Sequence, residues 1–409
     1  MKFNFHVSPN MRGRITTAGI MRDLTIGLLV VFLVGCCYYG LTWGWNYAGH
    51  ALLMLISSLL VTVVCEFVFA KCSGKDPKSF ILHSYGWVTA IILTMMCRID
   101  TPVYALMVAT FFAVAVARLM FGGFGQNIFN PAAVGRAVIF AAFSGAAVSD
   151  LATSATPVTT LASNFSWLPA NQEVLDGFFE QIGGGFDMLA MGTHPGAIGE
   201  TFGLLILVVG VWLAYRHVID WRIPVVYLGT IFIVTLVIAL ASGLGSYNGI
   251  PGFLWYPMLH LLTGGVIFGA VFMLTDPVTS PTGVQGRVFF AVCAAILTVL
   301  IRTKANLPEG CLYSILIMNI FTPMIESALD GKQLEQKKKA IIMLCCALAA
   351  GIGVSFYASA TIEPVTVVTS GATSGATSGA TEEGGDDHTD SSATETTDAD
   401  AHATEGEGE

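Results

Sequence analysis

The chain has 409 residues, of which 54% are apolar and only 11% are charged, and its mean hydropathy is +0.70. A soluble domain carries about 25% charged residues, so this composition excludes an ordinary soluble protein and indicates a polytopic membrane protein. The formal net charge is −9, but residues 361–409 hold 12 of the 28 acidic side chains and none of the 19 basic ones. The remaining basic residues are scattered singly, which argues against nucleic-acid binding.

The first residues do not have the pattern of a cleavable signal peptide. Residues 1–23 are basic and polar, without a short apolar core and a small-residue cleavage site. The apolar run that begins at Leu24 is long enough to remain in the membrane as a helix. We therefore expect residues 1–23 to be a cytoplasmic N-terminal segment.

Eleven apolar runs approach the roughly 20 residues that a membrane-crossing helix needs. They predict an all-α polytopic membrane protein with about 10–11 transmembrane helices. These helices would form a first half, residues 24–148, and a second half, residues 200–360. Several runs contain Gly or Pro and are candidates for broken or re-entrant segments. The runs are 24–44, 47–70, 81–97, 103–121, 132–148, 200–216, 223–243, 252–275, 286–302, 311–329 and 340–358.

The distribution of Lys and Arg predicts the orientation of the chain. With the N-terminus in the cytoplasm and eleven spans, sixteen basic residues fall inside and three outside, as the positive-inside rule requires. The outside residues are Arg98, Arg302 and Lys304; those inside include Arg118, Arg136, Arg216 and Lys337–Lys339. Residues 149–199, which contain no Lys or Arg, then form an extracytoplasmic loop.

The sequence GGFGQNIFNPA at 122–132 joins the fourth and fifth runs. Its glycines permit unusual backbone angles, and the amides of Asn127 and Asn130 could pair with free backbone groups or with a ligand. A tight turn capped by Asn and restarted by Pro131 explains the same residues without a ligand. The residues by themselves favour the turn.

The 149–199 loop begins with a small, hydroxyl-rich stretch, DLATSATPVTT at 150–160. Such a stretch is usually a flexible connection, but an accessible Thr between small neighbours also suits covalent attachment of a cofactor. The loop is long for a simple connection, which is typical of functional use. Its aromatic residues predict that it packs on something, or that it forms a belt at the membrane surface. They are Phe165, Trp167, Phe178, Phe179 and Phe186.

Two segments of the second half carry polar residues inside apolar surroundings. In TDPVTSPT at 275–282, Asp276 ends an apolar run, where a carboxylate is costly and often functional, although it also suits a helix cap. The second segment contains LPEG at 307–310 and IMNIFTP at 317–323. NIFTP at 319–323 is similar to NIFNP at 127–131, which hints at an internal duplication.

Four of these segments together resemble the membrane subunits of the Rnf electron-transport complex and of the Na⁺-translocating NADH:quinone reductase. They are the 150–156 stretch, 122–132, 275–282 and the PEG…MNIFTP region, and the resemblance extends over residues 8–358. In that family, Asp-x-x-Thr/Ser-x-Ala-Thr is a flavinylation motif. The resemblance implies that Thr156 carries FMN through a phosphoester bond and that Asp150, Thr153, Ser154 and Ala155 complete the motif. Ser154 stands where the family often has Gly.

The N-terminus distinguishes the two complexes. SPNMR at 8–12 opens almost directly into the first span, which resembles the D subunit of the Rnf complex, whereas the B subunit of the quinone reductase has a longer extension. The family more often has Ser-Pro-His here, so Asn10 is a departure. The resemblance implies a translocase and oxidoreductase subunit of the bacterial cytoplasmic membrane. The span count and the distribution of Lys and Arg place Thr156 on its extracytoplasmic side.

The same resemblance implies how the complex works and what this subunit binds. The complex would move electrons between ferredoxin and NAD⁺, coupled to Na⁺ or H⁺ transport. The partners would be the A, B, C, E and G subunits of Rnf, a flavin transferase and the lipid bilayer. An ion path or a second, non-covalent flavin is expected in one polar region, formed by Asn127, Asn130, Asp276, Thr279 and Asn319. The alternatives are the B subunit of the Na⁺-translocating NADH:quinone reductase and a solute channel or transporter in which Thr156 has no special role.

The remaining features support no site of their own. The nine cysteines include no Cys-x-x-Cys pair, so we expect no metal or iron–sulfur site. Five polar residues near apolar runs are candidates for an ion path or for paired structural residues: Glu66, His83, Arg118, His260 and Glu326. Residues 361–409 predict a disordered acidic tail. Its Ser-Gly-Ala-Thr repeats resemble the attachment sequence of the Rnf G subunit, but they are better explained as a flexible spacer.

Overall fold

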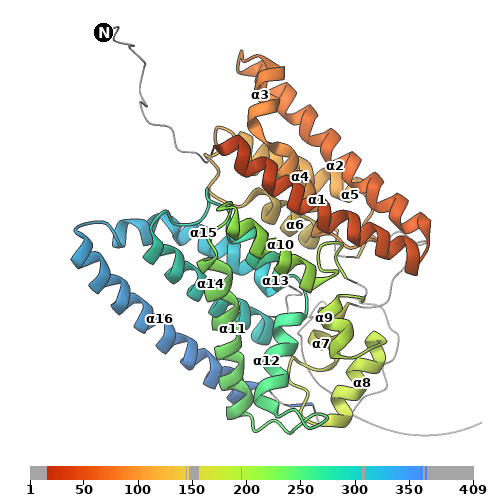
Figure 1. Ribbon diagram of the computed structural model, residues 1–409, viewed down its shortest axis with the longest axis vertical. Coiled ribbons are helices and arrows are strands. Elements are labelled where there is room, and N and C mark those ends of the chain that lie inside the picture. The colour runs from red at the N-terminus through yellow and green to blue at the C-terminus, as the bar shows by residue number, and fades with distance from the viewer. Residues whose placement is uncertain are drawn as a thin grey trace, which may run out of the picture. The chain divides into compact units, whose positions relative to one another are not determined.

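The computed structural model describes residues 16–143, 145–146, 156–194, 196–305, 309–362 and 364–365. These residues form helices and three isolated β-bridges, and none of them lies in a β-strand (Figure 1). The predicted all-α polytopic fold is thereby confirmed. The predictions for most of the N-terminal segment, for residues 150–155 and for almost all of the acidic tail concern residues outside this set.

Six of the described helices are long and apolar enough to cross a membrane. A seventh span forms if the bent pair α12 (Gly252–Leu262) and α13–η3 (Val266–Met273), which meet at 69°, is counted as one. The six are α1 (Thr17–Thr42), α2 (Trp45–Cys72), α11 (Arg222–Ala241), α14 (Val284–Lys304), α15 (Gly310–Ala328) and α16 (Gln333–Thr361).

The other four predicted spans form shorter helices, so the count of long spans is smaller than the ten or eleven expected. They are α4 (Gly86–Met95), α5 with η1 (Val103–Phe111 and Phe112–Leu119), α6 (Pro131–Ala142) and α10 (Gly203–Tyr215). Tyr85 and Phe202 adopt left-handed angles, with φ of 54° and 61°, directly before α4 and α10. Tyr85 also separates α4 from α3 (Pro77–Ser84), which makes this pair a second broken helix. Broken segments are therefore a feature of both halves.

Two π-helical segments lead into the polar motifs noted in the sequence. η1 (Phe112–Leu119) ends just before the 122–132 loop, and η3 (Gly269–Met273) ends just before 275–282. π-helical turns are rare and frequent at functional sites. Their matching positions in the two halves agree with an internal duplication.

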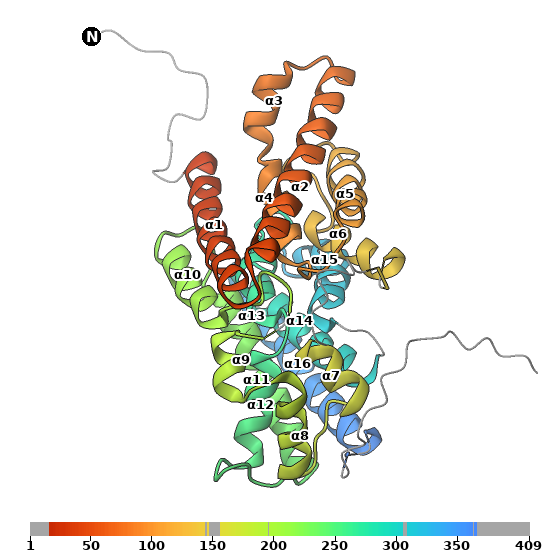
Figure 2. The same cartoon turned by 90° about the vertical axis from the view of Figure 1, so that its right-hand side faces the viewer.

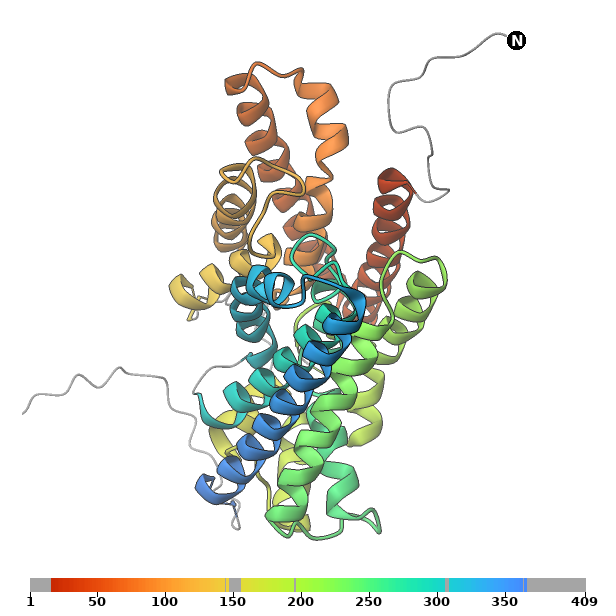
Figure 3. The same cartoon turned by 90° about the vertical axis from the view of Figure 1, so that its left-hand side faces the viewer.

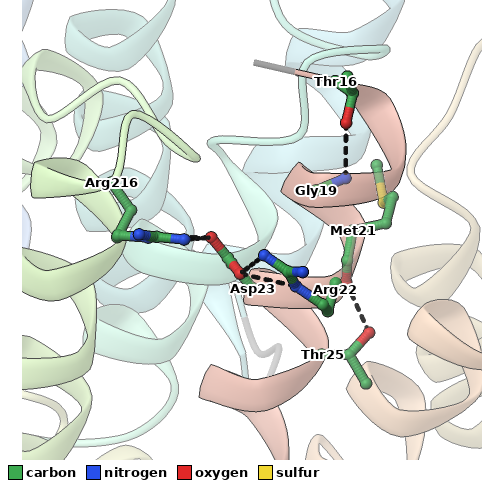
Figure 4. Close-up of polar contacts among 7 residues, drawn as sticks. All are labelled: Thr16, Gly19, Met21, Arg22, Asp23, Thr25 and Arg216. Atoms are coloured by element: carbon green, nitrogen blue, oxygen red, sulfur yellow. Dashed lines mark hydrogen bonds and ion pairs between the residues drawn. The ribbon is translucent and has the colours of Figure 1, made fainter. Parts of the chain in front are cut away.

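Helix α1 is capped by a side chain and fixed to α10 by an ion pair. The hydroxyl of Thr16 accepts a hydrogen bond from the Gly19 N–H at 3.2 Å (Figure 4). Asp23, on the buried side of α1, accepts from Nε and Nη2 of Arg216 at 3.0 and 2.7 Å and also contacts Arg22. Because Arg216 follows the last residue of α10, this contact joins the first half to the second.

The helices of each half pack mainly against one another, and α6 of the first half contacts α15 of the second. In the first half α2 packs against α4 and α5, and in the second α14 packs against α11, α15 and α16. Figure 3 shows α16 (blue) lying along α11 and α14. Helix α6 of the first half packs on α15 of the second, which brings the segments containing NIFNP and NIFTP together.

Three arginines used for the orientation lie inside this helical body. Arg118, Arg136 and Arg302 are each 3–4% exposed. Buried residues do not report which side of a membrane a loop occupies, so these three arginines are left out of the count and the orientation stays a prediction. Without these three the predicted distribution is fourteen inside against two outside, and its direction is unchanged.

The 149–199 region packs on the second half, as its aromatic residues predicted. It forms α7 (Pro157–Asn164), α8 (Gln172–Ile182) and α9 (Phe186–Met191), which lie beside α12 in Figures 1 and 2. Phe165 and Phe178 are buried with ring centroids 5.6 Å apart. Trp167 stacks on His260 of α12 at 5.0 Å. These rings fill the protein interior and do not form a surface belt.

Candidate functional site

Thr156 is fixed at the start of α7. Its side-chain oxygen accepts from the Thr159 N–H at 3.3 Å and lies 3.0 Å from the Thr159 hydroxyl, and Pro157 follows as the first helical residue. This is an ordinary N-cap, which satisfies a backbone N–H that the first turn leaves free. The side chain is 8% exposed. Asp150, Thr153, Ser154 and Ala155, the rest of the predicted motif, lie outside the described residues.

Thr156 lines a cavity of about 220 Å³ between the two halves of the protein. The polar wall contains two arginines and three carboxylates, and Phe140 and Phe143 form part of the apolar wall. The charged residues are Arg98, Asp100, Arg136, Glu200 and Glu309. They come from the loop after α4, from α6, from the loop before α10 and from the residue before α15. The fold thus assembles around Thr156 a set of charges that is dispersed in the sequence.

Most of these charges are paired. Nη2 of Arg98 donates to Asp100 at 2.7 Å, and Nη2 of Arg136 donates to Glu309 at 2.9 Å. Arg136 also lies over the ring of Phe140, with its guanidinium carbon 4.2 Å from the centroid. Each arginine is therefore held in place at the cavity wall by a carboxylate.

Glu200 is the carboxylate with no arginine or lysine within 4.0 Å among the described residues. Its Oε2 accepts from the Ala197 N–H at 3.3 Å. Burial, together with the nearby carboxylate of Glu309, raises the pKa of Glu200 to about 7.

The sequence did not identify these charged neighbours as one site. Arg98 and Arg136 entered only as orientation markers, and Glu309 only as part of the PEG segment. Glu200 did not enter at all. One signal was present, because Arg136 and Glu200 lie in predicted apolar runs, where an ionisable residue is costly and often functional.

The five residues predicted for an ion path or second flavin come together at another place. Asn130 caps α6, accepting from Ala132 N–H, and its Nδ2 donates to Met273 C=O at 3.3 Å. With its amide oriented to satisfy both neighbours, Asn319 donates to Ile315 C=O at 3.2 Å and accepts from Asn130 N–H at 2.9 Å. The repeated motifs therefore meet through their asparagines.

Asp276 and Thr279 stabilise the 275–282 turn, whereas the Nδ2 of Asn127 donates to Phe129 C=O at 3.0 Å within its own loop. Asp276 accepts from Val278 N–H at 3.1 Å and from the Thr279 hydroxyl at 3.2 Å. Asn127, Asn130 and Asp276 line one cavity of about 80 Å³, which Thr279 and Asn319 do not line. Pockets for organic ligands usually measure roughly 300–1,000 Å³. This cavity is smaller than that range, and the ion path and the second flavin stay predictions.

The other candidate polar residues have structural partners. Glu66 and Arg118 are buried and 3.8 Å apart, and Glu326 accepts from both the N–H and the hydroxyl of Thr282 at 2.9 Å. His83 is exposed and bonds to Ser79 C=O. His260 is the exception: it is buried against Trp167, and neither of its ring nitrogens has a hydrogen-bond partner among the described residues. Within the described ranges, no three His, Cys, Asp or Glu residues are grouped to hold a metal ion.

Comparison with known proteins gives a consistent set of relatives. A family model described as the NQR2, RnfD, RnfE family matches residues 4–335. The D subunit of the proton-translocating ferredoxin:NAD⁺ oxidoreductase complex of Clostridium ljungdahlii is 34% identical, covering 79% of this chain and 93% of the relative. The D subunit of the Na⁺-translocating complex of Acetobacterium woodii is 33% identical, covering 78% and 91%. The D subunit of an ion-translocating oxidoreductase complex of Pseudomonas aeruginosa is 30% identical, covering 78% and 92%.

Proposed function

The chain belongs to the NQR2, RnfD, RnfE family, and on that premise we propose that it is the D-type membrane subunit of an ion-translocating ferredoxin:NAD⁺ oxidoreductase complex. In this proposal Thr156 carries FMN through a phosphoester bond, and the protein relays electrons within the complex. The coupling ion is Na⁺ or H⁺. The relatives named above include one of each kind, so family membership does not select between them.

One observation carries the flavin proposal: the Thr156 hydroxyl lies on the wall of a cavity that also presents two arginines. A phosphoester is anionic, and arginines at a partly buried site favour an anion. The α7 N-terminus adds the partial positive charge of a helix dipole. Arg98 and Arg136 are already paired with Asp100 and Glu309, and Glu200 adds a third carboxylate. The support for an FMN phosphoester is therefore the place of Thr156 on the cavity wall and the α7 N-terminus, and not a net positive charge. When bound, FMN supplies reversible one- and two-electron chemistry, while the protein supplies position and electrostatics.

The covalent bond is tested on the assembled complex purified from native membranes. On a denaturing gel, the band of this chain should fluoresce under ultraviolet light, and Thr156→Val should abolish that fluorescence. Thr159→Val is the matched control, because Thr159 lies in the same turn and bonds to Thr156 but is not the proposed acceptor. A dark wild-type band, or fluorescence that survives Thr156→Val, contradicts the proposal.

We further propose that Thr156 faces the extracytoplasmic side of a bacterial cytoplasmic membrane and that the other Rnf subunits and a flavin transferase are its partners. Ser163 on α7 is exposed, so Ser163→Cys should react with an impermeant maleimide in intact cells. Cys72, exposed at the end of α2, should react only after the membrane is permeabilised. The opposite pattern would place the site in the cytoplasm.

A further inference from the structure

Helices α14, α15 and α16 line a groove on the second half of the protein. Helix α14 packs against both of the others, whereas α15 and α16 have little contact with each other among the described residues. The two helices share the turn at 329–332 and diverge from it in Figure 1. The groove that they leave has a volume of about 460 Å³.

The described lining of this groove is apolar throughout. The lining residues recur every three or four positions along each helix, so they lie on one face of it. They include Phe289 and Leu297 of α14, Phe321 and Ala328 of α15, and Met343 and Ala347 of α16. Such a surface favours hydrocarbon and offers no partner to a polar ligand.

The wall residues favour a flexible chain over a second helix. Helix pairs in membranes approach each other through small residues. The α15 side of this groove instead carries Met318, Phe321 and Met324, and Phe321 and Met324 are exposed. These long side chains keep a helix at a distance, while the flexible thioethers of methionine adapt to an irregular partner.

One end of the groove is basic. Lys332 lies in the turn before α16, and Lys337–Lys339 lie in the second turn of that helix. All four lysines are exposed, and none has a carboxylate within 4.0 Å among the described residues. A helix N-terminus is the positive end of the helix dipole and disfavours lysine. Helix stability therefore does not explain these charges.

Lys339 connects the basic end to the groove. It precedes Met343 by four positions, so it lies on the groove-lining face of α16. Its Nζ donates to the C=O of Asp330 at 3.4 Å, two residues after Ala328, which lines the groove at the end of α15. The ammonium group therefore lies where α15 and α16 meet.

The acidic residues near this end do not neutralise it. Residues 329–340 contain Asp330 and Glu335 against four lysines. Glu326, near the end of α15, is engaged elsewhere, since it accepts from the N–H and the hydroxyl of Thr282 at 2.9 Å. A net positive charge remains beside the apolar groove.

We propose that the groove between α15 and α16 binds an anionic phospholipid. One acyl chain lies in the groove, and the phosphodiester group pairs with Lys339 and the neighbouring lysines, because basic sites between membrane helices recognise anionic headgroups. The lipid fixes α16, the least buried of the six long apolar helices, of which 17% is buried against 33–56% for the others. This inference is independent of the proposed function of Thr156.

Photolabelling in a bilayer tests the site. The complex purified from native membranes is placed in phosphatidylcholine nanodiscs with a trace of phosphatidylglycerol that carries a diazirine in its acyl chain. A phosphatidylcholine probe with the same chain is the comparison. The groove-lining peptides should take up the phosphatidylglycerol probe at least about fivefold more, the effect of roughly one lysine beside an anionic lipid.

Variants identify the residues responsible. Lys332→Gln/Lys337→Gln/Lys338→Gln/Lys339→Gln should reduce the labelling ratio of the two probes to about one. The matched control is Lys71→Gln/Lys75→Gln/Lys78→Gln, which removes another exposed basic cluster, near the start of α3, that does not line the groove. Ala350→Trp fills the groove from an exposed position and should reduce labelling by both probes.

Three outcomes would overturn the lipid site. Equal labelling of the groove by the two probes means that it meets only bulk lipid. A phosphatidylglycerol preference that persists without the four lysines removes the proposed headgroup contact. Labelling that occurs in the isolated full-length chain but not in the complex means that another subunit covers the groove.

Discussion

At each of the two helix breaks described above, α3–α4 and α12–α13, a buried arginine donates hydrogen bonds to backbone carbonyl groups, but the residues around the arginine differ. At the α3–α4 break, the guanidinium of Arg118 donates to Ser84 C=O. At the α12–α13 break, Arg302 donates to His260 C=O at 2.7 Å and to Thr263 C=O at 2.8 Å. Each arginine pairs carbonyl groups that an interrupted helix leaves without intrahelical partners. Interrupted helices deep in a membrane protein require such partners.

The breaks differ in how the charge of the arginine is compensated. Arg118 lies 3.8 Å from Glu66, which also accepts from the Ser84 hydroxyl at 2.5 Å. Arg302 has no carboxylate within 4.0 Å among the described residues and lies over the ring of Trp167 at 5.0 Å. It shares a water-sized cavity of about 20 Å³ with Glu200 and Glu309. The positive charge of Arg302 is therefore compensated partly by Glu200, whose pKa is raised to about 7.

They differ also in what packs against the glycine at each break. A β-carbon on Gly86 would overlap the carboxylate of Glu66, within the same half. A β-carbon on Gly264, where φ is +72°, would lie 2.5 Å from Cγ2 of Val158, the second residue of α7. The residue that packs on the first break, Glu66, thus belongs to the same half of the protein. The residue that packs on the second break, Val158, belongs to α7, the helix that Thr156 caps. This difference predicts that disturbing the second break also disturbs the Thr156 site.

The largest expected loss of stability is at the α3–α4 break, where Glu66 compensates the charge of Arg118. Glu66→Ala leaves the buried Arg118 without its carboxylate and should lower the free energy of unfolding by about 3–5 kcal/mol. An SDS titration of the purified chain measures this loss. The double variant Glu66→Leu/Arg118→Met should lose less than the single one. If the double variant is the less stable, the pair is not the reason for the effect.

The second prediction concerns the pH dependence of stability that Glu200 causes near the α12–α13 break. Glu200 has a pKa of about 7 in the folded protein, above the ordinary value of 4.5. A raised folded-state pKa gives stability that is present below pH 4.5 and is lost as the pH rises through 7, here about 2–3 kcal/mol. The same titration at pH 5 and pH 8 measures this loss, and Glu200→Gln should reduce it. An unchanged pH dependence in Glu200→Gln would assign it to other groups.

Arg302→Gln should have a smaller effect than Glu66→Ala, about 2 kcal/mol. The substitution loses hydrogen bonds to buried carbonyl groups, which lowers stability. The loss is limited because a buried charge is removed and no carboxylate is left without a direct partner. Because Val158 packs on this break, Arg302→Gln should also reduce the fraction of chains that carry fluorescent flavin on the denaturing gel. Arg118→Gln, at the other break, should leave that fraction unchanged.

The sequence was sufficient for the helices but not for where they break. Each of the eleven apolar runs forms helix, because burying or facing lipid with so many apolar side chains requires paired backbone groups. Tyr85 and Phe202, directly before α4 and α10, adopt left-handed angles without being glycine, which no composition pattern signals. Run length therefore overestimated the number of full-length spans.

The candidate site was predicted at one residue only. Thr156 was identified because its neighbours match a short motif, whereas Arg136 and Glu309 are 173 positions apart and meet only through tertiary packing. The charge of Arg136 was visible, but it was interpreted as a sign of orientation. A charged residue in the middle of an apolar run, which is costly unless paired, was the better signal.

The smallest effect, about 1 kcal/mol or less, is expected for Trp167→Phe, and it tests how Trp167 supports the second break. Trp167 presents its ring to Arg302 and stacks on His260, while its Nε1–H has no acceptor among the described residues. Phenylalanine keeps an aromatic face, weakens the cation–π contact and removes an unpaired N–H, so the gains and losses largely cancel. Trp167→Ala removes the face altogether and should cost more than Arg302→Gln. If Trp167→Phe is as damaging as Trp167→Ala in the same SDS titration, the indole N–H and not the ring face holds the Thr156 loop against the break.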